Sequence, residues 1–105
     1  MAQFLAYANS NKATQKLFPY LLDIQSNLLD ELRTTVVIPL CPVLLAGATV
    51  ITKLCPVVEI ESRKYLLLTQ QIAGIDRKTL GKKTCDLAKY RQEIMAALDF
   101  IVSGI

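Results

Sequence analysis

Apolar side chains recur every three or four positions toward the C-terminal end of the chain, and this spacing predicts an amphipathic helix. The stripe consists of Leu87, Tyr90, Ile94, Leu98 and Ile101. Asp86 precedes the stripe and is a favourable N-cap residue. Gly104 follows it, where helices often end in a left-handed residue. One C-terminal helix is therefore predicted.

Short apolar runs separated by polar segments predict strands in the first part of the chain. The first two runs are residues 3–8 and 17–25, and Pro19 suggests that the second is an edge strand or carries a bulge. Residues 34–40 are almost continuously apolar, which indicates a central strand. Pro39 is expected to end its hydrogen-bond ladder because proline has no N–H.

Further strands are predicted in the second part. Residues 56–60 and 64–69 flank the polar turn at residues 61–63 and predict a hairpin. Residues 70–79 predict one more strand, interrupted at Gly74.

Two segments show neither the helical spacing of apolar residues nor an apolar run typical of a strand. Residues 26–33 are mainly polar and contain the adjacent pair Leu28 and Leu29, which suits a short helical turn or a wide loop, and residues 41–54 predict no single element. Antiparallel strands followed by one helix indicate an α+β fold with a strongly curved sheet or small barrel. The chain has no repeats or linkers, so residues 1–105 are expected to form one domain.

The composition is unusually apolar for a short chain. Of its 105 residues, 52% are hydrophobic, and the mean hydropathy is +0.36. A domain of this size buries a limited share of its surface, so a second copy is expected to cover some apolar side chains. A homodimer is therefore predicted.

The charge pattern gives little reason to expect nucleic-acid binding. The net charge is only +3, and the basic residues are scattered. The basic pair Lys82-Lys83 is expected to lie in a solvated turn. Because no RNA-binding aromatic pattern accompanies it, direct specific binding to nucleic acid is not expected.

The cysteines also point away from a metal site or a cofactor. Cys41, Cys55 and Cys85 stand among apolar residues without CxxC spacing, and the chain has no histidine. Zinc binding and a histidine-activated cysteine nucleophile are therefore disfavoured. We expect the three to be small buried residues in a reducing cytoplasm.

Catalytic motifs are absent from the sequence. Asp23, Asp30 and Glu31 lie close together along the chain, and paired carboxylates can perform acid–base chemistry. Acidic residues near a turn are more often solvated or act as caps. The residues therefore favour a binding protein over an enzyme.

A membrane location is not expected. Residues 34–52 carry no charge, and a spanning helix needs about 20 residues. However, Pro39 and Pro42 would break such a helix, and its β-branched start favours a strand. The first residues lack the basic and apolar regions of a signal peptide.

Six segments, taken in order, resemble the CcdB family of toxins from bacterial toxin–antitoxin modules. They are AQFLAY near the start, DIQSNLLD at 23–30, VVIPL at 36–40, LCPVVEI at 54–60, LLTQQIAG at 67–74 and ALDFIVSGI at the end. The resemblance covers essentially the whole chain and is weakest between residues 41 and 53. Its specific parts are the DIQSNLLD and VIPL pair and the final Gly-Ile.

This resemblance implies a fold and a function. The family fold is a small dimer built on a curved, SH3-like antiparallel sheet, related to that of MazF, with one C-terminal helix. Such toxins bind the DNA gyrase A subunit and trap the complex in which DNA is cut but not resealed, without catalysis of their own. A cognate antitoxin, through a segment that is disordered when free, wraps the toxin and releases gyrase.

The resemblance also assigns the gyrase-binding residues, which are Ser103, Gly104, Ile105, Asp99, Leu28, Leu29 and Ser26. Uncharged residues at the end of a helix could enter a partner's cleft without desolvating a side-chain charge. Two simpler interpretations stand beside this one: a routine glycine cap at the helix end, and leucines that belong to the core. Some family members carry an aromatic residue at the position of Ser103, so a lower affinity, greater reliance on the leucines or a different target is implied.

Two other functions remain open. A MazF-like ribonuclease toxin would need a general base and positive groups around the scissile phosphate, to which Arg33 and Arg77 could contribute. The sequence lacks the N-terminal Gly-Asp and the Arg-Pro segments associated with that family. The other possibility is a degenerate, non-toxic dimer kept for autoregulation with its antitoxin.

Overall fold

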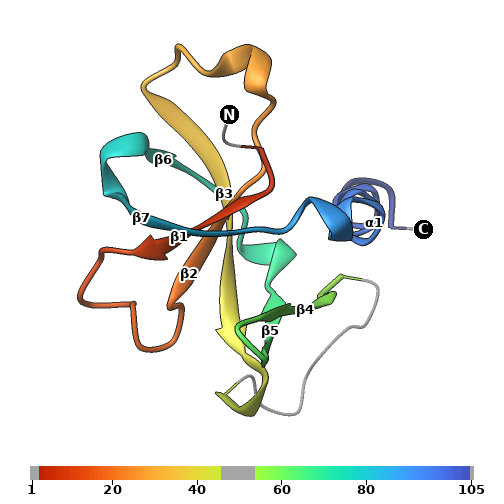
Figure 1. Cartoon of the computed structure of the whole chain (residues 1–105). Coiled ribbons are helices and arrows are strands. Elements are labelled where there is room, and N and C mark those ends of the chain that lie inside the picture. The colour runs from red at the N-terminus through yellow and green to blue at the C-terminus, as the bar shows by residue number, and fades with distance from the viewer. Residues whose placement is uncertain (1–2, 46–53, 105) are drawn as a thin grey trace.

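The computed structural model describes residues 3–45 and 54–104, and these residues form a curled antiparallel sheet with a C-terminal helix beside it (Figure 1). The seven strands follow the order β4-β5-β3-β2-β1-β7, and β6 pairs with β3. The strands are β1 (Leu5–Asn9), β2 (Tyr20–Asp23), β3 (Thr34–Pro42), β4 (Val57–Ile60), β5 (Arg63–Leu67), β6 (Ala73–Asp76) and β7 (Leu80–Asp86), and the helix is α1 (Arg91–Ser103). The predicted α+β fold with a single C-terminal helix is confirmed.

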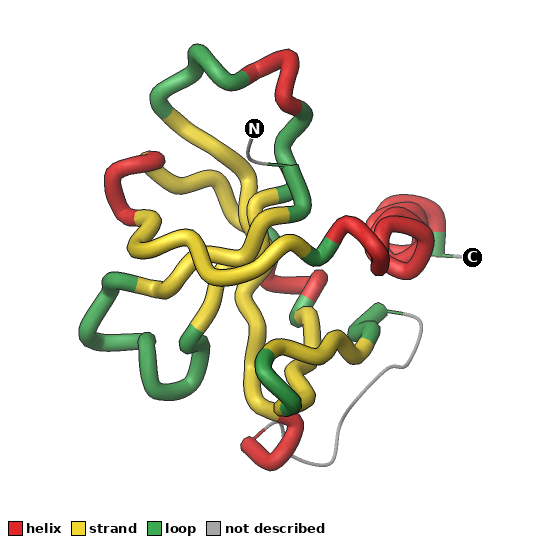
Figure 2. The backbone as a smooth tube through the Cα atoms, viewed as in Figure 1, coloured by secondary structure: helices red, strands yellow, loops and turns green. Residues whose placement is uncertain are grey.

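Short 3-10 turns lie in several of the connections between these elements, as Figure 2 shows. They are η1 (Asn27–Leu29), η2 (Val43–Leu45), η3 (Thr69–Gln71), η4 (Arg77–Thr79) and η5 (Ala88–Tyr90). The short helical turn expected within residues 26–33 is therefore present as η1. Most of the segment at 41–54 lies outside the described residues.

Strand β3 is central, as predicted, but it does not end at Pro39. It pairs with β2 along one side, and on the other with β6 up to Val37 and with β5 from Leu40. Pro39 falls between these two ladders, where its missing N–H costs no ladder hydrogen bond. Its carbonyl accepts the Leu68 N–H at 3.0 Å. The strand therefore continues to Pro42.

Other strand predictions need correction. Strand β2 begins after Pro19 and pairs with both β1 and β3, so it is neither an edge strand nor bulged there. Lys82 and Lys83 lie in the edge strand β7, which pairs with β1, and not in a turn. Exposed lysines are common on edge strands because they oppose pairing with other chains. Strand β6 runs through Gly74 without a break.

The hairpin of β4 and β5 is confirmed. Ile60 pairs with Arg63, and the two residues between them, Glu61 and Ser62, have positive φ angles of 52° and 67°. Two successive left-handed residues give the tight turn that matches the twist of a two-stranded ribbon.

The hydrophobic core lies between the sheet and the start of the C-terminal helix. Its fully buried side chains include Leu22, Ile38, Leu40, Ile60, Leu67, Leu87 and Ile94. The predicted stripe is thus buried at its start and becomes exposed at Ile101. The Tyr90 hydroxyl accepts the N–H of Glu59 at 3.1 Å, which ties the beginning of α1 to strand β4.

Both helix ends are fixed locally. The Asp86 carboxylate accepts the Ala88 N–H at 2.8 Å just before η5, so it does not cap α1 itself, whose N-cap residue is Tyr90. Gly104 has a φ of 73°, and its N–H donates to the Phe100 carbonyl at 2.8 Å. The predicted left-handed glycine cap is confirmed.

The cysteine prediction is confirmed in two of three cases. Cys41 and Cys55 are buried and Cys85 is half-buried, and all three are free thiols. Burial raises the pKa of the Cys41 thiol, which keeps it protonated and unreactive at neutral pH. Among the described residues, no helix is long and apolar enough to span a membrane.

Gly81 allows strand β7 to approach β1 closely. A Cβ on Gly81 would lie 2.7 Å from the Ala8 carbonyl oxygen, whereas a Cβ on Gly74 would meet no atom within 4 Å. We expect Gly81→Ala to lower the free energy of unfolding by about 1–3 kcal/mol, because the two backbones must separate. Gly74→Ala, the matched control, is expected to change it by less than about 0.5 kcal/mol. Urea denaturation checks both, and equal losses would contradict the close approach.

Candidate functional site

The first group of predicted binding residues, here called the tail, lies at the C-terminal end of α1. Asp99, Ser103 and Gly104 are all exposed, and Ile105 lies outside the described residues. The Ser103 hydroxyl donates to the Asp99 carbonyl at 2.8 Å, so it is held against the helix. The left-handed Gly104 ends α1.

The second group lies in the connection between β2 and β3, residues 24–33, which we call the η1 loop. Leu28 is 94% exposed and Leu29 is 45% exposed, so the interpretation of these leucines as core residues is wrong. The Ser26 hydroxyl oxygen accepts the Leu28 N–H at 3.1 Å and caps η1. Ser26 therefore positions the turn that presents the two leucines.

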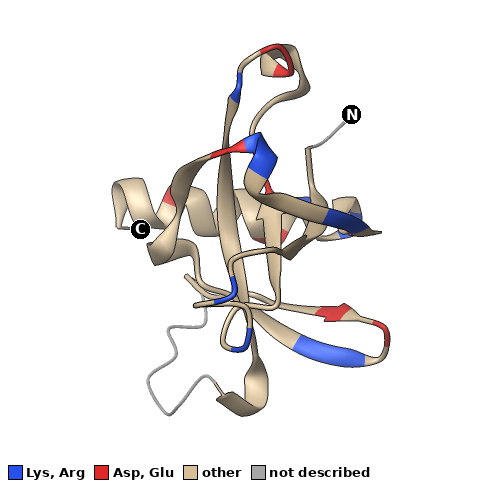
Figure 3. Ribbon diagram, turned by 90° about the vertical axis from the view of Figure 1, so that its left-hand side faces the viewer, with Lys and Arg blue, Asp and Glu red and all other residues tan. Residues whose placement is uncertain are grey.

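The tail and the η1 loop are separate surfaces of one chain. In Figures 1 and 3, η1 lies at one extremity of the molecule, and the end of α1 lies to the side of the sheet. Helix α1 packs chiefly on η3 and η5. Figure 3 shows that the ribbon near the C-terminal end is largely uncharged. Each surface combines exposed apolar side chains, Leu28 and Leu29 in the η1 loop and Val102 at the end of α1, with polar and charged neighbours.

A buried carboxylate lies beneath the η1 loop. Asp23, at the end of β2, is fully buried, whereas Asp30 and Glu31 are exposed. Its Oδ1 accepts the Thr35 hydroxyl at 2.7 Å and the Gln25 N–H at 3.1 Å. Asp23 is therefore not solvated, although its bond with the Gln25 N–H caps the turn that follows β2.

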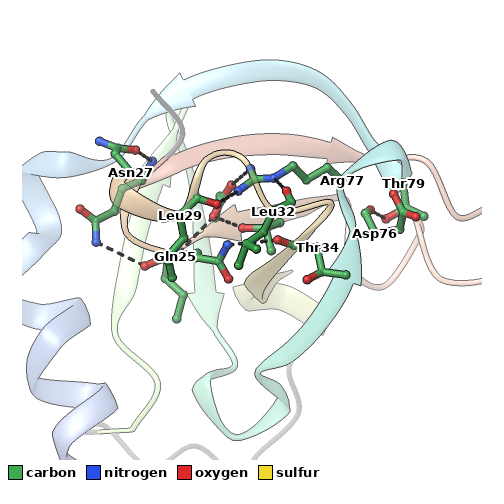
Figure 4. Close-up of polar contacts among 12 residues, drawn as sticks. Gln25, Asn27, Leu29, Leu32, Thr34, Asp76, Arg77 and Thr79 are labelled. Carbon is green, nitrogen blue, oxygen red and sulfur yellow. Dashed lines mark hydrogen bonds and ion pairs between the residues drawn. The ribbon is translucent and has the colours of Figure 1, made fainter.

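Arg77 is the cationic partner of this carboxylate. Its Nη1 lies 3.7 Å from Asp23 Oδ2, an oxygen that accepts no hydrogen bond from the residues the structure describes. The same guanidinium donates to two carbonyls of the η1 loop: Nε to Leu32 at 2.6 Å and Nη2 to Leu29 at 3.2 Å (Figure 4). The sequence did not reveal this contact, because β3, β4, β5 and β6 separate Arg77 from the loop along the chain.

The pKa of Asp23 is raised mainly by burial, against the lowering effects of the Thr35 and Gln25 hydrogen bonds and of Arg77. A raised pKa means that the folded chain holds this proton more tightly than the unfolded chain does. The contribution of Asp23 to stability is therefore complete below the ordinary aspartate pKa of about 3.9 and falls as the pH rises through the raised value.

We expect the unfolding free energy of the wild type, minus that of Asp23→Asn, to decrease as the pH rises across this range. Asparagine cannot ionise, so the variant lacks this titration and serves as the reference at each pH. Urea denaturation of both proteins at several pH values measures the difference. An increase with pH would show that pairing with Arg77 outweighs the cost of burying the charge.

The two arginines considered for a ribonuclease do not form an open, positively charged site. Arg77 is engaged with Asp23 and two backbone carbonyls. The side chain of Arg33 is 81% exposed, and its Nε lies 3.8 Å from Oδ2 of Asp76. The carboxylate nearest to Arg77 is fully buried, so it cannot reach a substrate hydroxyl as a general base.

A groove on another part of the sheet does not include the predicted residues. Its volume is about 490 Å³, and its lining includes Phe18, Leu21, Val37 and Ile75. None of the assigned gyrase-binding residues that the structure describes lines it. The tail and the η1 loop are therefore exposed surfaces and not parts of this cavity.

A comparison with protein families matches residues 3–104 to the family described as CcdB protein. The match spans nearly the whole chain, including both the η1 loop and the end of α1. The curled antiparallel sheet with one C-terminal helix agrees with the fold that the sequence resemblance implied. This chain therefore belongs to the CcdB family, the toxins of toxin–antitoxin systems.

Proposed function

We propose that this chain poisons DNA gyrase by binding its A subunit and trapping the complex in which DNA is cut but not resealed. Membership of the CcdB family supports the proposal at the level of a toxin. The observation that carries it further is the 94% exposure of Leu28, next to Leu29 in the η1 loop. Leucine is usually buried, and an apolar pair held in solvent is typical of a partner-binding surface.

The tail provides the second part of the proposed contact. Val102 is exposed beside Ser103 and Gly104, and the last turn of α1 carries no basic residue. Residues 100–104 carry no side-chain charge, so this end of α1 can enter a partner's cleft with little desolvation cost, whereas Asp99 would need a polar partner there. Serine cannot stack on an arginine as an aromatic ring does, so the leucines of the η1 loop carry more of the binding energy here.

We also propose that two copies pair, so that the ends of both α1 helices lie side by side. Met95, Ile101 and Val102 leave apolar surface exposed on this helix in the single chain. A second copy would cover part of that surface and would present two tails to gyrase. A cognate antitoxin would then act by covering this dimer, and no step requires catalysis by the chain itself.

The direct experiment incubates the purified chain with gyrase, plasmid and ATP, and measures linear DNA after protein denaturation. We expect cleaved plasmid to accumulate. Leu28→Ser should raise the required concentration about tenfold or more, the effect of losing a significant interface contact. Leu44→Ser is the matched control, because Leu44 is 96% exposed in η2, outside both proposed surfaces. No cleavage with the wild type would reject the proposal.

A further inference from the structure

Beyond Ile24, which packs against the core, the η1 loop has little apolar anchoring of its own. Leu28, Leu29 and Leu32 all point substantially into solvent, so they contribute few core contacts. Its internal backbone hydrogen bonds are local, such as Leu29 N–H to Ser26 and Leu32 N–H to Leu29. Local turns of this kind do not fix a loop relative to a sheet, so other contacts must do so.

One residue outside the loop holds its second half. Arg77 begins η4, and its own N–H donates to the Arg33 carbonyl at 2.9 Å. Its side chain donates to the carbonyls of Leu29 and Leu32, as Figure 4 shows. Backbone and side chain of this single arginine thus engage three carbonyls between residues 29 and 33.

The first half of the loop is held by a different residue. The Gln3 N–H donates to the Asn27 side-chain oxygen at 3.0 Å, and the Gln3 amide donates to the Ile24 carbonyl at 3.3 Å. Leu28 and Leu29 therefore lie between a contact from the N-terminal segment and a contact from η4.

Asp23 orients the arginine. Its buried carboxylate lies 3.7 Å from Nη1, while Nε and Nη2 point to the loop carbonyls. A planar guanidinium can contact a carboxylate and two carbonyls simultaneously, because its N–H donors point in several fixed directions. A lysine ammonium is a single point charge and lacks this planar set of donors. The geometry therefore requires an arginine and not only a positive charge.

We propose that Arg77, oriented by Asp23, is a positioning residue that clamps the η1 loop in the conformation that presents Leu28 and Leu29 to gyrase. This inference rests on the proposed function. A loop that is ordered before binding loses less conformational entropy in the complex, so its order contributes to affinity. Arg77 itself need not touch gyrase.

The test compares Arg77→Met and Arg77→Lys with the neighbouring Lys78→Met, which removes the same charge from an exposed position. Hydrogen exchange is measured for the amides of residues 27–33 and of β3, and gyrase poisoning is titrated in parallel. We expect both Arg77 variants to speed loop exchange by about tenfold or more, as the loss of charge-assisted hydrogen bonds implies. Lys78→Met should leave both readouts unchanged.

The protein concentration needed for half-maximal cleavage should depend on the order of the η1 loop and not on global stability. Both Arg77 variants should need several times more protein for half-maximal cleavage. Gly81→Ala, which weakens the fold at β7 away from the loop, should poison as the wild type does. If Arg77→Met alone fails to fold, the double variant Arg77→Met with Asp23→Asn removes the unpaired buried charge and takes its place.

The outcomes separate the two proposals. Unchanged loop exchange in Arg77→Met, or full rescue by Arg77→Lys, would overturn the clamp. Faster loop exchange with undiminished poisoning would overturn its role in gyrase binding. If the wild type poisons nothing, the proposed function fails, while the exchange measurement still decides whether Arg77 orders the loop.

Discussion

A chain lacking Gly104 and Ile105 is expected to lose gyrase poisoning and to keep its fold. Gly104 is exposed, and its one described backbone hydrogen bond, to Phe100, lies at the end of α1. Removing such a bond at an exposed terminus costs only about 1 kcal/mol of stability. Losing a central interface contact typically weakens binding by 2 kcal/mol or more, which corresponds to about 30-fold.

The plasmid-cleavage assay with the truncated chain measures this loss, and circular dichroism with sedimentation verifies that fold and oligomeric state are retained. Gly104→Ala is a milder variant for comparison with the truncation. The added Cβ would meet no atom within 4 Å, but the φ of 73° at this position is unfavourable for alanine. That strain is about 1–2 kcal/mol and should redirect the tail without removing it. If the truncated chain poisons as well as the wild type, the tail is not the contact.

Ile94→Ala is expected to lower the free energy of unfolding by about 2–5 kcal/mol, because it leaves a cavity where the helix meets the sheet. Ile94 is fully buried in the cluster that joins α1 to the strands. Gln92 lies two residues earlier on the same helix and is exposed. Gln92→Ala is therefore the control, with an expected change of less than about 0.5 kcal/mol.

Urea denaturation of both variants measures the difference. The loss from Ile94→Ala is a large share of the 5–15 kcal/mol that stabilises a typical domain. The variant should therefore populate states in which α1 and its tail leave the sheet, and its poisoning should fall at higher temperature. Equal losses for the two variants would show that α1 is not anchored through Ile94.

Elements governed by local pattern could be predicted from the sequence. The α1 stripe, the Gly104 cap and the β4–β5 hairpin depend on residues close together along the chain, and the structure confirms all three. Strand β7 was missed because an edge strand with exposed lysines shows little apolar alternation. Pro39 was misjudged because its tolerance depends on two different neighbouring strands.

The candidate site was likewise only partly predictable from the sequence. The resemblance pointed to Leu28 and Leu29, and the structure adds that both are exposed. The contact between Asp23 and Arg77 could not be anticipated, because it forms only when η4 folds back over the β2–β3 connection. Composition likewise gave no indication that one aspartate near a turn would be fully buried.

The most direct test of the central claim is growth after induced expression, without antitoxin, in two bacterial hosts that differ only in gyrase A. One host carries gyrase that CcdB-type toxins poison, and the other carries an altered, resistant gyrase A. Arrest of the first host and growth of the second, at equal levels of folded protein, is the predicted result. Arrest of both hosts or of neither would contradict a toxin that acts through gyrase.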